Sequence, residues 1–150
     1  MLILDTNKTP YICNNGVKEE ICYPERGIVM AKRILVVDDD EMVLMALNEL
    51  LAPEGYEVDA ILRVSEALEK LDQDGYDLMM LDIIMPEMDG FELCKRIRKM
   101  ERYKETPIVF LTAKSREEDR VLGLEAGANL FLSKPISPDK LLGIVSDTIG

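Results

Sequence analysis

Apolar residues fall into two alternating patterns over most of this chain. From residue 33 onward, short continuous runs of Val, Ile, Leu and Met alternate with longer segments in which apolar residues recur at helical spacing. A continuous apolar run is typical of a strand buried on both faces, and helical spacing is typical of an amphipathic helix. The pattern therefore predicts strands that alternate with helices.

The predicted strands cover residues 33–37, 56–62, 78–82, 108–112 and 130–133. The predicted helices cover residues 64–71, 90–100, 116–126 and 138–148, together with a first helix between Asp40 and Pro53. Such alternation implies right-handed crossovers and a doubly wound parallel sheet. Five strands and five helices are the flavodoxin-like count, so we predict an α/β fold whose five-stranded parallel sheet has the order 2-1-3-4-5.

Several residues mark the ends of the predicted helices. Asp40 and Asp89 stand where a side-chain oxygen can cap a helix, and Pro138 stands at a helix start. Gly75, after Asp74, is expected to end the second helix in a left-handed conformation, and Gly127 is expected to close the fourth.

Polar residues follow four of the predicted strands at the point where each ends. Asp38 and Asp39 follow the first strand, and Asp82 ends the third. Thr112 ends the fourth strand and Lys134 follows the fifth. Since doubly wound sheets bind ligands at the carboxyl ends of their strands, these side chains should meet at one edge. Crowded carboxylates repel unless a cation neutralises them, and hard oxygen ligands favour Mg²⁺.

The simplest alternative is that these acids only cap helices. We accept it for Asp40 and Asp89, but capping explains one acid after the first strand and not the pair Asp38 and Asp39. It also fails for Asp82, because residues 83–86, Ile-Ile-Met-Pro, start no helix that this acid could cap. The alternative for Thr112 is a residue that is present only because it favours a strand. The alternative for Lys134 is a lysine at a strand end that only faces solvent.

Composition excludes several classes of function. The net charge of −11 disfavours binding to nucleic acid or to an anionic membrane, since both require clustered Lys and Arg. The sequence shows neither a membrane span nor a signal peptide, so the expected location is the cytoplasm. Without His there is no Ser-His-Asp or Cys-His scheme. Cys13, Cys22 and Cys94 form neither a disulfide framework nor a zinc set and are expected to be reduced and metal-free.

Residues 1–30 differ from the rest of the chain. They show neither helical nor strand periodicity, so we expect a mobile extension before a domain at 31–150. One interpretation is an upstream mis-start, because the codons for Arg26-Gly27 can resemble a ribosome-binding site before a second start at Met30. The rival interpretation is a tail that docks to a partner.

The combination of motifs resembles a response-regulator receiver domain of the CheY-like kind, from about residue 32 to residue 148. The stretch 81–90, Leu-Asp-Ile-Ile-Met-Pro-Glu-Met-Asp-Gly, is close to that family's signature. Asp38-Asp39, Thr112-Ala113 and Lys134-Pro135 occur in the order and spacing of the family. The resemblance implies a phosphoacceptor of a two-component system or phosphorelay, which takes a phosphoryl group from a histidine kinase or phosphotransfer protein.

The resemblance also implies a role for each site residue. Asp82 would be the phosphorylated nucleophile, and Mg²⁺ would be bound by Asp39, Asp82 and the backbone carbonyl of Ile84, with Asp38 acting through water. Lys134 and the Thr112 hydroxyl would contact the phosphoryl oxygens, as group transfer to an aspartate requires charge neutralisation. Such a domain is not an enzyme beyond catalysing its own phosphorylation and dephosphorylation.

Three residues are expected to tune this chemistry. In receivers, the threonine is coupled to an aromatic residue on strand five, and Phe131 occupies that place, although ordinary core packing explains it equally well. Ile84 lies two residues past Asp82 and Lys114 lies two past Thr112, so both should border the path of an attacking water. We expect Ile84 to exclude that water and Lys114 to add cover.

The sequence is less specific about the partner that receives the signal. The helix predicted at 116–126 resembles the corresponding helix of winged-helix transcription regulators. Those regulators form salt-bridged dimers through acids just before the strand-five aromatic residue and a basic residue midway along the last helix. This chain has Asn129-Leu130 and Leu142-Gly143-Ile144 at those places. This favours an apolar docking face on helix 4, strand 5 and helix 5 for an unknown protein target. Since the sequence ends with the last helix, we expect a stand-alone receiver or one excised from a longer regulator, without contact to nucleic acid or membrane.

Two other functions remain open. An aspartyl-phosphate phosphatase of the haloacid-dehalogenase type also uses Mg²⁺, and its strand-one acids two residues apart match Asp38 and Asp40, but Asp82 would then be unexplained. A pseudo-receiver would be a binding module without phosphorylation, and the intact set of site residues counts against it.

Overall fold

The computed structural model describes residues 2–4, 11–14, 19–22 and 28–150, with side chains from Ala31 onward. The chain divides into two compact units, residues 1–31 and 32–150. In the first unit, β1 (Leu2–Leu4) pairs antiparallel with β4 (Ile28–Met30), and β2 (Tyr11–Asn14) pairs antiparallel with β3 (Glu19–Cys22).

These strands were not expected from the sequence, because residues 1–30 show no alternation of apolar and polar positions. The mis-start interpretation concerns Arg26 and Gly27, which lie outside the described residues. The side chains of Cys13 and Cys22 lie outside them as well. The mobility and the role of this segment remain predictions.

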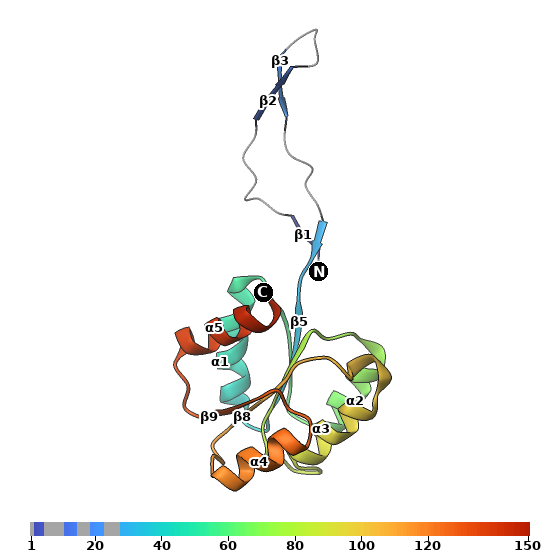
Figure 1. Ribbon diagram of the computed structural model, residues 1–150, viewed down its shortest axis with the longest axis vertical. Helices are drawn as coiled ribbons and strands as arrows, with labels where there is room; N and C mark the ends of the chain where they lie inside the picture. Colours follow the sequence, from blue (N-terminus) through green and yellow to red (C-terminus); the bar gives the residue numbers. More distant parts are fainter. Residues whose placement is uncertain (1, 5–10, 15–18, 23–27) are drawn as a thin grey trace. The chain divides into compact units, whose positions relative to one another are not determined.

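The second unit contains a five-stranded parallel sheet in the order β6-β5-β7-β8-β9 (Figure 1). Its strands are β5 (Arg33–Val37), β6 (Glu57–Ile61), β7 (Leu78–Leu81), β8 (Ile108–Thr112) and β9 (Leu130–Ser133). Counted along this unit the order is 2-1-3-4-5, so the predicted flavodoxin-like fold is confirmed. The order reverses at β5, which is where doubly wound sheets bind their ligands.

Five α-helices connect and cover these strands. They are α1 (Glu41–Leu51), α2 (Val64–Gln73), α3 (Gly90–Lys99), α4 (Glu117–Glu125) and α5 (Pro138–Ile149). Short 3₁₀ turns, η1 (Ala52–Glu54) and η2 (Glu101–Tyr103), follow α1 and α3. In Figure 1, α1 and α5 cover one face of the sheet, and α2, α3 and α4 cover the other.

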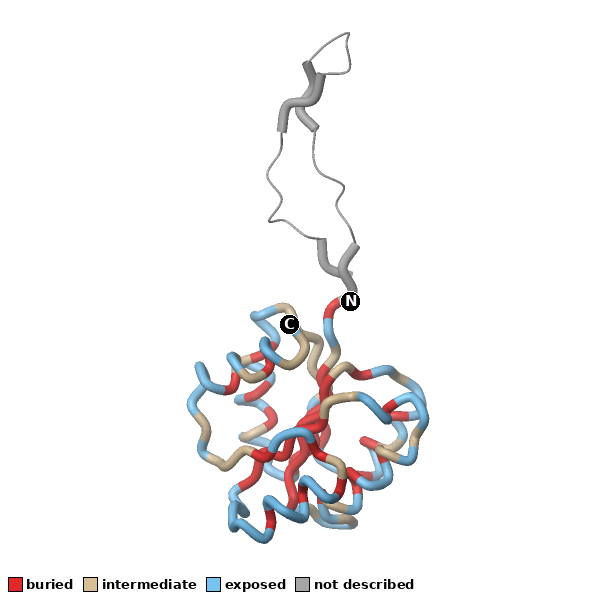
Figure 2. Tube along the Cα trace, viewed as in Figure 1, coloured by how far each residue is buried: buried red, intermediate tan, exposed pale blue. Residues whose placement is uncertain are grey.

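The two faces of the sheet carry two separate hydrophobic cores. Leu35 and Val37 of β5 belong to the core on the side of α2 and α3, whereas Ile34 and Val36 belong to the core on the side of α1 and α5. Neighbouring residues of a strand point to opposite faces, so a strand covered on both sides must be apolar throughout. The central strands are accordingly buried along their length (Figure 2).

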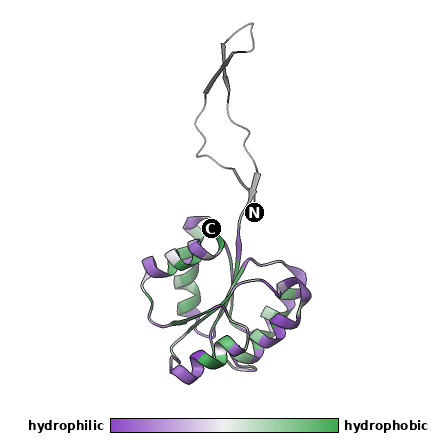
Figure 3. Cartoon of the chain, viewed as in Figure 1, coloured by the Kyte–Doolittle hydropathy of each residue, from purple (hydrophilic) through white to green (hydrophobic). Residues whose placement is uncertain are grey.

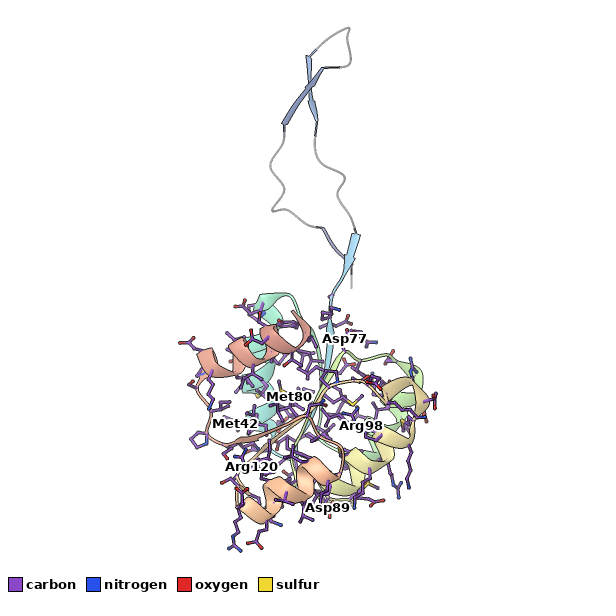
Figure 4. The ribbon with its side chains drawn as sticks, in the orientation of Figure 1. Met42, Asp77, Met80, Asp89, Arg98 and Arg120 are labelled. Carbon is purple, nitrogen blue, oxygen red and sulfur yellow. The ribbon has the colours of Figure 1, made fainter. Side chains whose placement is uncertain are left out.

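The predicted acidic caps are present. Asp40 Oδ1 accepts a hydrogen bond of 2.9 Å from the amide of Met42, and Asp89 Oδ1 accepts one of 2.9 Å from the amide of Glu92. Asp89 stands at the start of α3 in Figure 4. Gly127, which was predicted to close α4, follows this helix and has a left-handed φ of 112°.

The predicted left-handed end of α2 is wrong. Asp74 caps this helix in an extended conformation, with a φ of −114°, and Gly75 is not among the described glycines with positive φ. The Tyr103 hydroxyl donates to the carbonyls of Leu71 and Asp74, and the Arg102 guanidinium donates to the carbonyl of Leu71 at 3.5 Å. Side chains from η2 thus satisfy carbonyls that a left-handed turn would otherwise bind.

Candidate functional site

The carboxyl ends of β5, β7 and β9 bring three acids and a lysine together. Lys134 Nζ lies 2.6 Å from Asp38 Oδ2 and 3.3 Å from Asp82 Oδ2. Asp38, Asp39 and Asp82 each place one carboxylate oxygen within 4.8 Å of the others. The two Lys134 contacts join residues that are 96 and 52 positions apart in the sequence, so it is the parallel sheet that brings the cluster together.

Burial makes the charges in this cluster interact strongly. Asp38 is 3% exposed and Asp82 is 8% exposed, whereas Asp39 is exposed. Burial raises the pKa of Asp38, an effect that the hydrogen bonds from Lys134 and the Asp40 amide oppose and the Asp82 charge reinforces. For Lys134, burial lowers the pKa, but the bonds to Asp38 and the charge of Asp82 outweigh it, so the net shift is upward and the ammonium stays charged.

The donor set is suited to a hard divalent cation. Three carboxylates and one ammonium leave two negative charges uncompensated, and all three acids offer oxygen ligands. Mg²⁺ is bound in proteins by one or two carboxylates while keeping several waters, which an exposed acid such as Asp39 permits. The described acidic triad could therefore hold a metal ion, and receiver domains use Mg²⁺.

The loop after β7 fixes the backbone of Asp82. The Asp82 amide donates to the carbonyl of Val37 at 3.0 Å, and Asp82 Oδ1 accepts from the amide of Ile83 at 2.7 Å. The Gly90 amide then donates to the carbonyl of Ile83 at 2.9 Å, which folds the loop back. A Cβ at Gly90 would lie 2.1 Å from the carbonyl oxygen of Asp82, so this approach requires glycine.

Thr112 and Lys114 are joined through the backbone after β8. Thr112 is fully buried, and its Oγ1 accepts a hydrogen bond of 3.2 Å from the amide of Lys114. The amide of Lys134 donates to the carbonyl of Thr112 at 2.8 Å, which ties the ends of β8 and β9 together. Lys114 Nζ lies 3.5 Å from Asp119 Oδ1 of α4, a partner that the sequence did not predict.

Phe131 is buried between β8 and α4. Its ring centroid lies 6.1 Å from that of Phe110, and the Arg120 guanidinium carbon lies 5.4 Å from its centroid. Gly123 makes room for these rings, because a Cβ there would lie 3.0 Å from Phe131 and 3.1 Å from Phe110. Arg120 is labelled in Figure 4. The Phe131 ring therefore points into the core, a placement that both the proposed coupling to Thr112 and ordinary core packing explain.

Apolar side chains are exposed on α4 and β9. They are Val121, Leu122, Leu124 and Leu130. Part of α4 is coloured as hydrophobic in Figure 3. Ile144 of α5, expected on the same face, is only partly exposed.

Asp40, the second acid of the phosphatase interpretation, caps α1 through its Oδ1. Within the described residues, no helix has both the length and the apolar character that a membrane crossing requires.

The sequence matches the response regulator receiver domain family over residues 34–146. It is 44% identical over 109 residues to the alkaline phosphatase synthesis transcriptional regulatory protein PhoP of Bacillus subtilis, covering 73% of this chain and 45% of that protein. It is 35% identical over 120 residues to the probable transcriptional regulator ycf29 of Porphyra purpurea, covering 80% of this chain and 57% of that protein. The chain spans about half the length of these relatives.

Solved structures give the same result. The chemotaxis protein CheY4 of Vibrio cholerae superposes with a TM-score of 0.76 at 34% identity, covering 79% of this chain and 99% of that chain. A CheY-like receiver domain protein of Methanospirillum hungatei superposes with a TM-score of 0.75 at 32% identity, covering 80% and 94%. Members of this family are typically signalling modules and not enzymes. On its sequence, its strand order and its acidic site, this chain belongs to the response regulator receiver domain family.

Proposed function

We propose that this protein is a phosphoacceptor whose Asp82 takes a phosphoryl group from a sensor histidine kinase or phosphotransfer protein. The observation that carries the proposal is the position of Asp82, within 3.3 Å of the Lys134 ammonium and beside two further carboxylates. A carboxylate oxygen of Asp82 attacks phosphorus in line, the bond from phosphorus to the donor's imidazole nitrogen breaks, and an acyl phosphate forms. Family membership supports this role.

The residues around Asp82 assist by neutralising charge. The Lys134 ammonium interacts with a phosphoryl oxygen, and the Thr112 hydroxyl donates to another. Mg²⁺ held by the acidic triad would supply further positive charge to the reaction. We propose that the domain catalyses only the phosphorylation and dephosphorylation of its own aspartate. The phosphatase and the pseudo-receiver are the alternatives.

The experiment that tests the proposal is a mass measurement of the intact protein after incubation with acetyl phosphate and Mg²⁺. The expected result is the addition of one phosphoryl group, which hydroxylamine removes because it cleaves acyl phosphates. No addition, with Mg²⁺ still bound, would point to a pseudo-receiver. Continuous release of phosphate from a generic aryl phosphate would point to a phosphatase.

For the metal we propose Asp39, Asp82 and the carbonyl of Ile84 as direct ligands, with Asp38 acting through water. The structure supports this division, because Asp38 is buried against Lys134 whereas Asp39 is exposed. Asp38 also makes the shorter contact with the Lys134 ammonium, 2.6 Å against 3.3 Å for Asp82, so its carboxylate is the less available of the two as a metal ligand.

Asp39→Ala is therefore expected to weaken Mg²⁺ binding more than Asp38→Ala. A direct ligand contributes more than one that acts through water, and we expect the loss at Asp39 to be on the order of tenfold. Titration with Mg²⁺ followed by NMR or tyrosine fluorescence measures both dissociation constants. Equal or reversed effects contradict the proposed coordination.

The output of the domain is proposed to start at Thr112 and Phe131. Movement of the Thr112 hydroxyl toward a phosphoryl oxygen would change the packing beside Phe131, which the α4 residues Gly123 and Arg120 contact. The exposed apolar residues of α4 and β9, with the neighbouring part of α5, are the proposed docking face for a protein target. We propose residues 31–150 as the receiver, 1–30 as an extension, and the cytoplasm as its location.

Ile84 is proposed to prolong the life of the acyl phosphate. It lies two residues past Asp82, is 60% exposed, and has no group that can hydrogen-bond a water. Lys114, two residues past Thr112, is the second residue in this role.

Ile84→Asn is expected to shorten the lifetime of the phosphorylated form by roughly tenfold, which corresponds to about 1.4 kcal/mol of barrier. The asparagine amide can orient an attacking water, as polar groups do at other phosphoryl-transfer sites. Phosphate release from both proteins under excess Mg²⁺ measures the effect, and Ile84→Leu serves as the apolar control. Equal release from the Asn variant and the wild type would show that Ile84 does not act on the water.

A further inference from the structure

The first turn of α4 contains a buried acid with two partners. Asp119 is 4% exposed, although it lies in the first turn of a helix whose neighbouring Glu117 and Glu118 are exposed. Its Oδ2 accepts a hydrogen bond of 3.3 Å from the amide of Arg116, and its Oδ1 lies 3.5 Å from Lys114 Nζ. Asp119 thus joins the start of α4 to the residue that follows Thr112 by two positions.

Helix stabilisation explains only part of this arrangement. An acid in the first turn interacts favourably with unpaired helix amides, and the Arg116 contact has that role. It does not account for the Lys114 ammonium, whose side chain is about half exposed and has solvent available instead. The pair therefore fixes the direction of a flexible side chain two residues past Thr112.

The backbone of Lys114 is anchored at the other end of the connection between β8 and α4. Its amide donates to Thr112 Oγ1, the hydroxyl proposed to contact the phosphoryl group. Lys114 is therefore bound by its backbone to the threonine and by its side chain to α4. A cation held at this place has two possible anionic partners, the carboxylate of Asp119 and a phosphoryl oxygen on Asp82.

We propose that Asp119 is a positioning residue that competes with the phosphoryl group for the Lys114 ammonium. This inference rests on the proposed phosphorylation of Asp82. While Lys114 is paired with Asp119, the start of α4 is held and the phosphoryl group is less covered. When Lys114 transfers to the phosphoryl group, Asp119 becomes a buried carboxylate without its cation, and the first turn of α4 loses a contact. The pair thereby links the lifetime of the acyl phosphate to α4.

The reaction that responds is hydrolysis of the acyl phosphate. The oxygen of a water molecule forms a bond to phosphorus while the bond from phosphorus to the Asp82 carboxylate oxygen breaks. The products are the free carboxylate and inorganic phosphate, and the proton released passes to solvent. An ammonium over the phosphoryl oxygens blocks part of the water's approach.

Asp119→Asn separates the two functions of the acid. The asparagine oxygen can still accept from the Arg116 amide, whereas the charge that attracts Lys114 is gone. We expect phosphate release from the phosphorylated variant to slow by about threefold, the size typical of a partly exposed ion pair. Glu118→Gln makes the same change of charge at an exposed neighbour and is expected to leave the rate at the wild-type value.

A Lys114→Met background tests whether the effect passes through the lysine. Each protein is phosphorylated with acetyl phosphate and Mg²⁺, desalted, and followed by intact mass. If the proposal is right, Asp119→Asn changes the rate only when Lys114 is present. An equal change in both backgrounds, no change in either, or the same change in Glu118→Gln overturns it. Failure of the wild type to take up phosphoryl overturns the proposed function as well, whereas normal uptake with unaltered release overturns this inference alone.

Discussion

Asp82→Asn is expected to abolish the uptake of a phosphoryl group from acetyl phosphate. An amide oxygen is a poor nucleophile toward phosphorus, and an asparagine cannot form an acyl phosphate. Asp82 directly follows β7, the strand that lies between β5 and β8 in the sheet; Asp39 comes after β5, and Thr112 ends β8. The measurement is the mass of the intact protein after incubation with acetyl phosphate and Mg²⁺, which should stay at the unmodified value.

Asp89→Asn provides the matched control for this prediction. It makes the same chemical change at the other end of the same loop, and asparagine replaces aspartate well as a helix cap. We expect this variant to take up one phosphoryl group as the wild type does. A comparable rate of uptake in Asp82→Asn would show that another residue is the nucleophile.

Gly90→Ala is expected to lower the free energy of unfolding by about 3 kcal/mol, the upper part of the range for overpacking a rigid site. The added Cβ would stand 2.1 Å from the carbonyl oxygen of Asp82 and 2.9 Å from the Cα of Ile83. Both are backbone atoms, so the relief must come from moving the loop or α3. Denaturant unfolding measures the stability, and a loss of phosphorylation rate should accompany the displaced Asp82.

Gly143→Ala is the control substitution in the same protein. Gly143 lies inside α5, and a Cβ there meets no atom within 4 Å. Alanine should therefore stabilise the protein by roughly 0.5–1 kcal/mol, because it lowers the entropy of the unfolded chain and favours the helix. If Gly90→Ala were as harmless as Gly143→Ala, the proposed close packing of α3 against the Asp82 loop would be wrong.

The fold was predictable from the sequence because each strand and helix has a local signal. The continuous apolar runs of β5, β7 and β8 are required by helices on both faces of the sheet, and the spacing of apolar residues marks the helices between them. Asp40 and Asp89 cap their helices as predicted, since capping depends on neighbouring residues only. The four short strands that the structure describes among residues 1–30 lacked such a signal and were not predicted.

The composition of the site was predictable for a related reason. In a parallel sheet the carboxyl ends of all strands lie at one edge, so residues that follow the strands must gather there. The clustering of Asp38, Asp39 and Asp82 follows from this topology, and so does the approach of Lys134. Their roles in phosphoryl transfer remain proposals.

Only the tertiary structure decided how the side chains pair. The sequence did not indicate that Lys134 lies closer to Asp38 than to Asp82, or that Tyr103 would end α2 in place of a left-handed turn at Gly75. It also gave no sign of the pair between Lys114 and Asp119. Each of these contacts depends on side-chain rotamers and on the distance between packed elements, which the local period of a sequence does not specify. Local periodicity thus determined the sheet and the residues at its edge, and packing decided which charges and donors meet.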